Sequence, residues 1–230
     1  MRLRWLAWGF PVVAVAAGIA CIPDPKGDYE EFIERTADQR TSPEGGGGGL
    51  SDAAVDSKPP TEAVKGTYVA TCFTVLSSSA DNVLRFFTET NYTPDGGGGG
   101  KLTMSMKPLK GYADGKATPP KCVCQSETSG ATLNVTDAPV DAQGKFQVNM
   151  GKIDVPPEAN GISGRPITLD PIVLTGRFAS EKFCAELSGK VTQPISIELA
   201  PGDGKNICLF TPAKEGDAAP AFKEAEFVCK

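Results

Sequence analysis

The chain contains no histidine among its 230 residues. Histidine is the commonest general base and metal ligand in proteins because its side chain titrates near neutral pH. Its absence excludes Ser-His-Asp and Cys-His nucleophilic catalysis, and with them every zinc site that uses an imidazole ligand. Catalysis by a pair of carboxylates, as in glycoside hydrolysis, needs no histidine and remains open.

Positive charge is also in short supply. The chain carries 23 lysine and arginine residues against 28 aspartate and glutamate residues, which gives a net charge of −5. No cluster of basic residues offers a footprint for nucleic-acid phosphates. We therefore expect no nucleic-acid partner.

Long hydrophobic runs are absent except at the N-terminus. Arg2 and Arg4 precede an uncharged run over residues 5–20, which Gly9 and Pro11 interrupt. A membrane-spanning helix needs roughly 20 apolar residues. The short run, its positive flank and the small residues at its end instead predict a signal peptide over residues 1–20.

The signal peptide ends at a cysteine. The stretch Gly18-Ile19-Ala20-Cys21 resembles the bacterial lipobox, although glycine stands at position 18 where that motif has leucine. Ordinary signal peptidase would cut at the same place. The chain has seven cysteines, and an odd number in an exported protein leaves one thiol to explain. Attachment of a diacylglyceryl lipid to Cys21 accounts for it, so we predict a lipoprotein, with plain secretion as the alternative.

The six remaining cysteines are disulfide candidates, because export places them where thiols oxidise. They are Cys72, Cys122, Cys124, Cys184, Cys208 and Cys229. Among the 15 connectivities that six cysteines allow, we favour Cys184 with Cys208 and Cys72 with Cys229. In a strand, Cys122 and Cys124 would lie about 6.6 Å apart, so their direct pairing would require a distorted backbone. One CxC pair without further ligands does not predict a metal site, and we expect no cofactor.

Composition divides the rest of the chain into two parts. Residues 21–62 are rich in proline, glycine, serine and charged residues and predict a flexible tether. Within it, Tyr29, Phe32 and Ile33 fall on one side of a short helix predicted to run to Arg40. A coil of about 40 residues spans roughly 35 Å, so the tether holds the following domain clear of the lipid headgroups.

Residues 63–230 are predicted to form an all-β domain. Apolar and polar residues alternate in short runs broken by turn residues, and alternation with period two buries one face of a strand. The runs span residues 67–76, 83–92, 101–109, 132–135, 145–150, 167–169, 172–178, 183–191, 195–199 and 207–210. About ten short strands predict an antiparallel β-sandwich or barrel. The glycines at 96–100, after Pro94-Asp95, predict a hairpin tip.

The order of these features resembles that of uncharacterised myxobacterial lipoproteins. The similarity covers the acidic segment at residues 27–36 after the cysteine and, more weakly, the strings Gly66-Thr67-Tyr68 and Leu174-Thr175-Gly176-Arg177-Phe178. It is a resemblance of layout and short strings, and it contains no catalytic motif. It implies export and anchoring and leaves the activity open.

A group of aspartates and a group of phenylalanines can each be interpreted either as structural residues or as part of a binding site. We interpret four aspartates as solvated turn residues, although Asp137 and Asp141 could line a calcium loop; the four are Asp137, Asp141, Asp154 and Asp170. We assign five phenylalanines to the core and not to a ligand cavity: Phe86, Phe87, Phe146, Phe178 and Phe183.

The sequence predicts a lipid-anchored cell-envelope protein whose β domain is a non-enzymatic binding or structural module. Its expected partner is the membrane, reached through the lipid. Ile22 follows Cys21, where the better-known sorting scheme of lipoproteins has aspartate for retention, which indicates the outer membrane. The alternatives are a hydrolase acting on glycans through paired carboxylates, and a carrier of an apolar ligand. The interior of the domain should distinguish these functions.

Overall fold

The structure is a computed structural model that describes residues 58–202 and 204–221. The signal peptide, Cys21, the predicted helix and Cys229 lie outside the described residues, as does most of the predicted tether. The strands are β1 (Val64–Phe73), β2 (Leu84–Pro94), β3 (Gly100–Pro108), β4 (Tyr112–Ala113), β5 (Lys116–Ala117), β6 (Leu133–Val140), β7 (Lys145–Val155), β8 (Ile167–Arg177), β9 (Phe183–Gln193), β10 (Ile197–Leu199) and β11 (Ile207–Pro212). Two 3₁₀ turns, η1 (Gln125–Glu127) and η2 (Pro157–Ala159), lie in connections. The all-β prediction is confirmed.

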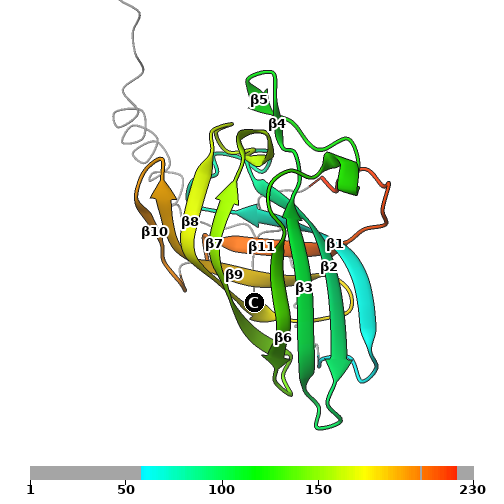
Figure 1. The fold of residues 1–230 in the computed structure, drawn as a ribbon. Helices are drawn as coiled ribbons and strands as arrows, with labels where there is room; N and C mark the ends of the chain where they lie inside the picture. The colour runs from blue at the N-terminus through cyan, green and yellow to red at the C-terminus, as the bar shows by residue number, and fades with distance from the viewer. Residues whose placement is uncertain (1–57, 203, 222–230) are drawn as a thin grey trace, which may run out of the picture. The chain divides into compact units, whose positions relative to one another are not determined.

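Eight of the strands close into an antiparallel barrel (Figure 1). Their order is β9-β11-β1-β2-β3-β6-β7-β8, and β8 pairs back onto β9. The first half of β9 pairs with β11, and its second half pairs with the short β10. Strands β4 and β5 form a separate hairpin. Of the two predicted architectures, the domain adopts the barrel.

The barrel has two different ends. The tight turns β2–β3 and β6–β7 lie at one end, which we call the hairpin end (Figure 1). The predicted hairpin tip is confirmed there: Gly96 to Gly99 lie between Pro94 and β3, Gly100 begins β3, and the Asp95 amide donates to the Gly99 carbonyl at 3.0 Å. The long connections over residues 74–83, 109–132 and 156–166 lie at the other end, the loop end.

Alternation in the sequence matches the two faces of most strands. In β3, Leu102, Met104 and Met106 are buried in the core, and the residues between them are more exposed. The runs predicted at residues 167–169 and 172–178 form the single strand β8, whose pairing with β9 shifts between Leu169 and Ile172. The hairpin β4–β5 was not predicted, because two residues per strand are too few to show a period.

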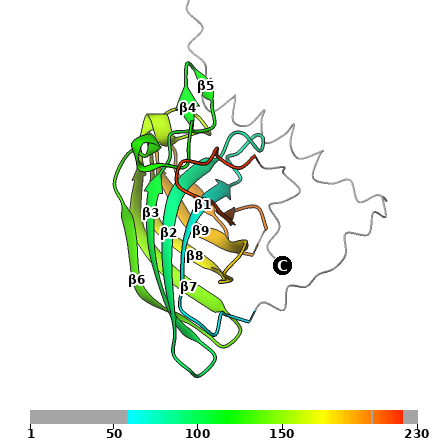
Figure 2. The same ribbon diagram turned by 90° about the vertical axis from the view of Figure 1, so that its right-hand side faces the viewer.

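Strands β1 and β2 depart from this pattern, because both of their faces are buried. Val69 and Phe87 point outward and pack with Leu109 and Val123 in a cluster of their own. The connection after β3 and the segment 213–221 supply this cover, and Figure 2 shows both beside β1 and β2. Phe87 therefore belongs to the outer cluster, whereas the other four phenylalanines assigned to the core lie in the barrel interior.

Gly189 on β9 is the tightest glycine position of the barrel. Its φ is +137°, and a Cβ atom there would lie 1.9 Å from the Pro171 carbonyl oxygen. We predict that Gly189→Ala lowers the free energy of unfolding by at least about 2 kcal/mol, because it combines an unfavourable φ with a backbone clash. Urea denaturation measures this change. Gly151→Ala is the matched control, since its φ is +64° and it has no neighbour within 4 Å. It should lose only about 1–2 kcal/mol, and equal losses in the two variants would contradict the assigned packing.

Candidate functional site

The interior at the hairpin end is filled by aromatic rings centred on Phe183. Its ring stacks on Phe210 at 4.4 Å between centroids and meets Tyr68 and Phe178 edge-on at 5.3 and 5.2 Å. Phe146 approaches it at 6.4 Å. These rings come from five different strands or strand ends, so one cluster joins much of the barrel wall from the inside.

Tyr92 joins this cluster by stacking on Phe178 at 5.1 Å between centroids, and the two buried tyrosines, Tyr68 and Tyr92, are hydrogen-bonded. The Tyr68 hydroxyl donates to the Ser180 carbonyl at 2.8 Å, and the Tyr92 hydroxyl donates to the Gly99 carbonyl at 2.9 Å. Burial raises the pKa of both phenols above the usual value. They are therefore neutral at physiological pH, and neither serves as a base.

A small cavity lies inside the loop end of the barrel. About 20 Å³ of it is open to the centre of a water molecule, which is room for about one water. The lining is entirely apolar, so it provides neither carboxylates for hydrolysis nor ligands for a metal. It consists of Cys72, Leu84, Phe86, Met106, Leu133, Met150, Ile153, Leu169, Ile172, Leu174, Leu187 and Cys208.

The outer face of β11, β1 and β2 carries buried polar groups that lack partners. Thr71 of β1 lies opposite Arg85 of β2. Thr211 of β11 lies opposite Val69 of β1. In the described part of the chain, four buried side-chain atoms have no hydrogen-bond partner: Arg85 Nε and Nη1, Thr71 Oγ1 and Thr211 Oγ1. Burial lowers the pKa of the Arg85 guanidinium, and the charge of Asp81 opposes this change. Chemically, the three side chains are donors for an anionic oxygen.

The two segments that cover this face, the connection after β3 and residues 213–221, are hydrogen-bonded to each other at Val123. Its amide donates to the Asp217 carbonyl at 2.7 Å, and its carbonyl accepts from the Gly216 amide at 2.9 Å. The Val123 side chain is fully buried between the two half-buried cysteines of the CxC pair. The covering segments thus meet at one residue.

The disulfides differ from the predicted pairings. Cys72 pairs with Cys208, its direct neighbour across β1 and β11, with a Cα–Cα distance of 3.9 Å. The predicted pairs Cys184–Cys208 and Cys72–Cys229 are therefore wrong, because sequence spacing does not reveal strand register. Cys184 is also disulfide-bonded.

Cys122 and Cys124 pair directly, contrary to the argument from strand geometry. Their Cα atoms lie 5.4 Å apart, less than in an extended strand, because this segment is an irregular loop ahead of η1. The distance falls within the range that a disulfide requires. The bond thus closes a ring around Val123.

The four aspartates are all exposed. Asp141 Oδ1 accepts from the amides of Gln143 and Lys145 and so stabilises the β6–β7 turn. Asp154 accepts from the Thr168 hydroxyl and pairs with Lys152, and these contacts lower the pKa of its carboxyl. Among residues 58–202 and 204–221, no three acidic or cysteine side chains gather as a metal site would require. The turn interpretation holds for Asp141 alone, because Asp137, Asp154 and Asp170 lie on the exposed faces of β6, β7 and β8.

Comparison of the chain with family models, curated proteins and solved structures finds no match. Among the described residues, no helix is long and apolar enough to cross a membrane. The site is therefore defined by the barrel and by its covered outer face. Arg85 escaped the sequence reasoning, because an arginine in an alternating strand is indistinguishable from an exposed one until the covering segments are placed.

We predict that Arg85→Met leaves the free energy of unfolding unchanged or raises it by up to about 2 kcal/mol. Methionine fills a similar volume and removes a buried cation with two unpaired donors. Thermal denaturation measures the change, and Lys65→Met on exposed β1 surface is the control. A loss above about 2 kcal/mol would show that the guanidinium has a partner that offsets its burial.

Proposed function

We propose that the protein is a lipid-anchored protein of the cell envelope, attached through Cys21, whose barrel is a non-enzymatic binding or structural module at the outer membrane. The signal peptide, the lipobox-like stretch and the odd cysteine count support the anchor. The disulfides of the barrel are compatible with an exported location.

The cysteine pairing is compatible with a lipid on Cys21. Four described cysteines pair among themselves, and Cys184 is also disulfide-bonded. Because the chain has seven cysteines, disulfides within it leave at least one unpaired, and a lipid on Cys21 would account for that one.

The filled interior of the barrel is the observation that favours a binding or structural module over a carrier or an enzyme. Eight-stranded barrels enclose a space that side chains can just fill or that holds one small ligand. Here the rings around Phe183 occupy the hairpin end, and about 20 Å³ remains open at the loop end. A fatty acid or a sugar is many times larger. Binding to a partner would then fall to the exterior and the loops.

The apolar carrier is a second candidate because the cavity lining is wholly apolar. Such a cavity stays dry and admits small apolar molecules once it is enlarged. The hydrolase is less well supported, since the cavity holds no carboxylate and Asp137, Asp141, Asp154 and Asp170 lie on the surface.

The anchor is tested by replacing the cysteine. We predict that Cys21→Ser moves the protein from the membrane fraction to the soluble fraction, because the substituted residue cannot receive the thioether-linked lipid. Immunoblotting of fractionated cells measures the distribution. The intact mass of the detergent-extracted wild type should exceed that of the polypeptide 21–230 by a diacylglyceryl group.

Two variants separate failed anchoring from other effects. Ile22→Asp keeps Cys21 and should leave the protein membrane-bound while changing which membrane holds it. Ile195→Ala, at an exposed position of the barrel, should change neither property. A Cys21→Ser protein that stays in the membrane would overturn the anchor.

The carrier is tested through the cavity. We predict that the wild type binds neither a fluorescent fatty acid nor benzene, because its cavity is too small. Ile172→Ala should admit benzene and destabilise the barrel by about 2–5 kcal/mol, since Ile172 is fully buried in the lining. Isothermal titration measures binding, with Ile195→Ala as the surface control. Stoichiometric binding of the fatty acid to the wild type would favour the carrier.

A further inference from the structure

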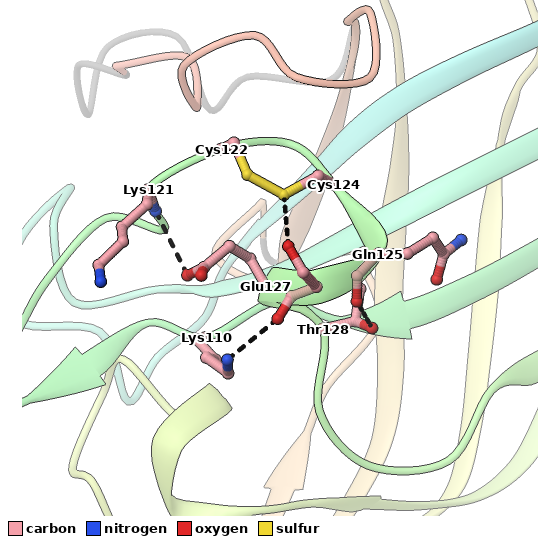
Figure 3. Close-up of a disulfide and its surroundings, with 8 residues drawn as sticks. Lys110, Lys121, Cys122, Cys124, Gln125, Glu127 and Thr128 are labelled. Carbon is pink, nitrogen blue, oxygen red and sulfur yellow. Dashed lines mark hydrogen bonds between the residues drawn. A yellow bond between two sulfur atoms is a disulfide. The ribbon is translucent and has the colours of Figure 1, made fainter.

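The CxC disulfide lies in the cover on the outer face of the barrel. Figure 3 shows Cys122 and Cys124 ahead of η1, with Lys121 next to Cys122 and Lys110 near η1. Both cysteines are half-buried, and the Cys124 sulfur belongs to an exposed contact with Ser126. A thiolate in solution therefore has access to this bond.

The other described disulfide offers an internal comparison. Cys72 and Cys208 are 2% and 1% exposed, and they lie between paired strands inside the closed barrel. A thiolate reaches that bond only when the wall opens. The two bonds also constrain the chain differently, because their sequence separations are 136 and 2 residues. A long closed loop restricts the unfolded chain far more than a short one, so breaking the CxC bond should leave the barrel folded.

The surroundings distinguish the two sulfur atoms of the CxC pair. Ser126 Oγ lies 3.2 Å from Cys124 Sγ. A disulfide sulfur has no hydrogen, so the hydroxyl donates. Lys110 Nζ donates to the Ser126 carbonyl at 3.1 Å and helps to hold Ser126 in place. A hydrogen-bond donor at the sulfur stabilises a thiolate. Cys124 is therefore the better leaving sulfur.

We propose that Cys122–Cys124 is a reversible thiol–disulfide exchange site whose substrate is an accessible thiolate. The incoming thiolate attacks Cys122 Sγ, a mixed disulfide forms there, and the Cys122–Cys124 bond breaks to release Cys124 as a thiolate. A second thiolate attacks the sulfur of the substrate in the mixed disulfide and releases Cys122. Two substrate thiols are oxidised to one disulfide, the CxC pair takes up the two electrons, and the two protons pass to the cysteine thiolates.

The exchange has a structural consequence in the cover. The closed ring holds Val123 with its side chain in the outer cluster and its backbone bonded to the segment 213–221. Opening the ring frees the backbone on both sides of Val123. The Val123 amide, which donates to the Asp217 carbonyl, and the Gly216 amide, which donates to the Val123 carbonyl, should then exchange with solvent faster.

The experiment uses the oxidised full-length chain under native conditions. It is incubated with graded reduced glutathione, or with a peptide containing one cysteine, and quenched with acid. Free thiols are alkylated and located by peptide mapping. We expect Cys122 and Cys124 to be reduced at least about 100-fold faster than Cys72 and Cys208, because the latter require local opening of the barrel. The early mixed disulfide should lie on Cys122. Comparing the two reagents shows whether the site prefers a small thiol or a peptide thiol.

Ser126→Ala tests the positioning of the leaving sulfur. Loss of one hydrogen bond should slow exchange by about 2–10-fold and spread the mixed disulfide over both cysteines, with no change in the melting temperature of the barrel. Ser129→Ala is the matched control, because Ser129 lies in the same connection and bonds Glu158 instead. Hydrogen exchange of the Val123 and Gly216 amides is followed in parallel.

Several results would overturn the proposal. Equal reduction rates for the two disulfides would remove the distinction between the sites. A CxC bond that stays oxidised until the barrel unfolds would make it a purely structural bond. Equal exchange rates in Ser126→Ala and the wild type would remove the role of Ser126 in stabilising the Cys124 thiolate.

Discussion

The closure of the barrel through β9 is the constraint on which the other features depend. β9 pairs along one side with β8 and along the other side with β11 and then β10. Phe183 begins this strand and directs its ring into the aromatic cluster, where it contacts residues of β1, β7 and β11. Ladder closure and ring packing reinforce each other, because the narrow interior of eight strands needs large side chains to fill it. A filled interior in turn leaves the exterior and the loops as surfaces for binding.

The architecture could be predicted from the sequence because most strands have one face in the core and one in water. Residues such as Leu102, Met104 and Met106 display this period directly. The choice between sandwich and barrel could not be predicted, since it depends on whether β8 pairs with β9. For β1 and β2, the same alternation did not indicate that the outer face is also buried. Val69 and Phe87 are apolar, and only the placement of the cover explains why they point outward.

Disulfide pairing illustrates a second limit of sequence reasoning. Cys72–Cys208 joins β1 to β11, the first and last strands of the barrel in the sequence, and neither predicted pair contains this combination. The partner of Cys72 was wrong, since register across two strands 136 residues apart leaves no trace in spacing. For Cys122 and Cys124 the error was the assumption of an extended strand. The loop ahead of η1 shortens the Cα–Cα distance enough for direct pairing.

The barrel and its cover differ in how they resist opening. The barrel strands share one core and are joined by ladders of several residue pairs, except that β6 and β7 pair only at Val140 and Phe146, beside their turn. Along the other seams, a strand separates only when several bonds break at once. The two covering segments meet through the two backbone hydrogen bonds of Val123, above a small apolar cluster. Beneath this cover lies Arg85, whose unpaired donors make burial of this face costly. Local opening therefore requires less free energy at the cover than in the barrel wall. A conformational response of this domain to a partner would occur at the cover, while the barrel stays closed.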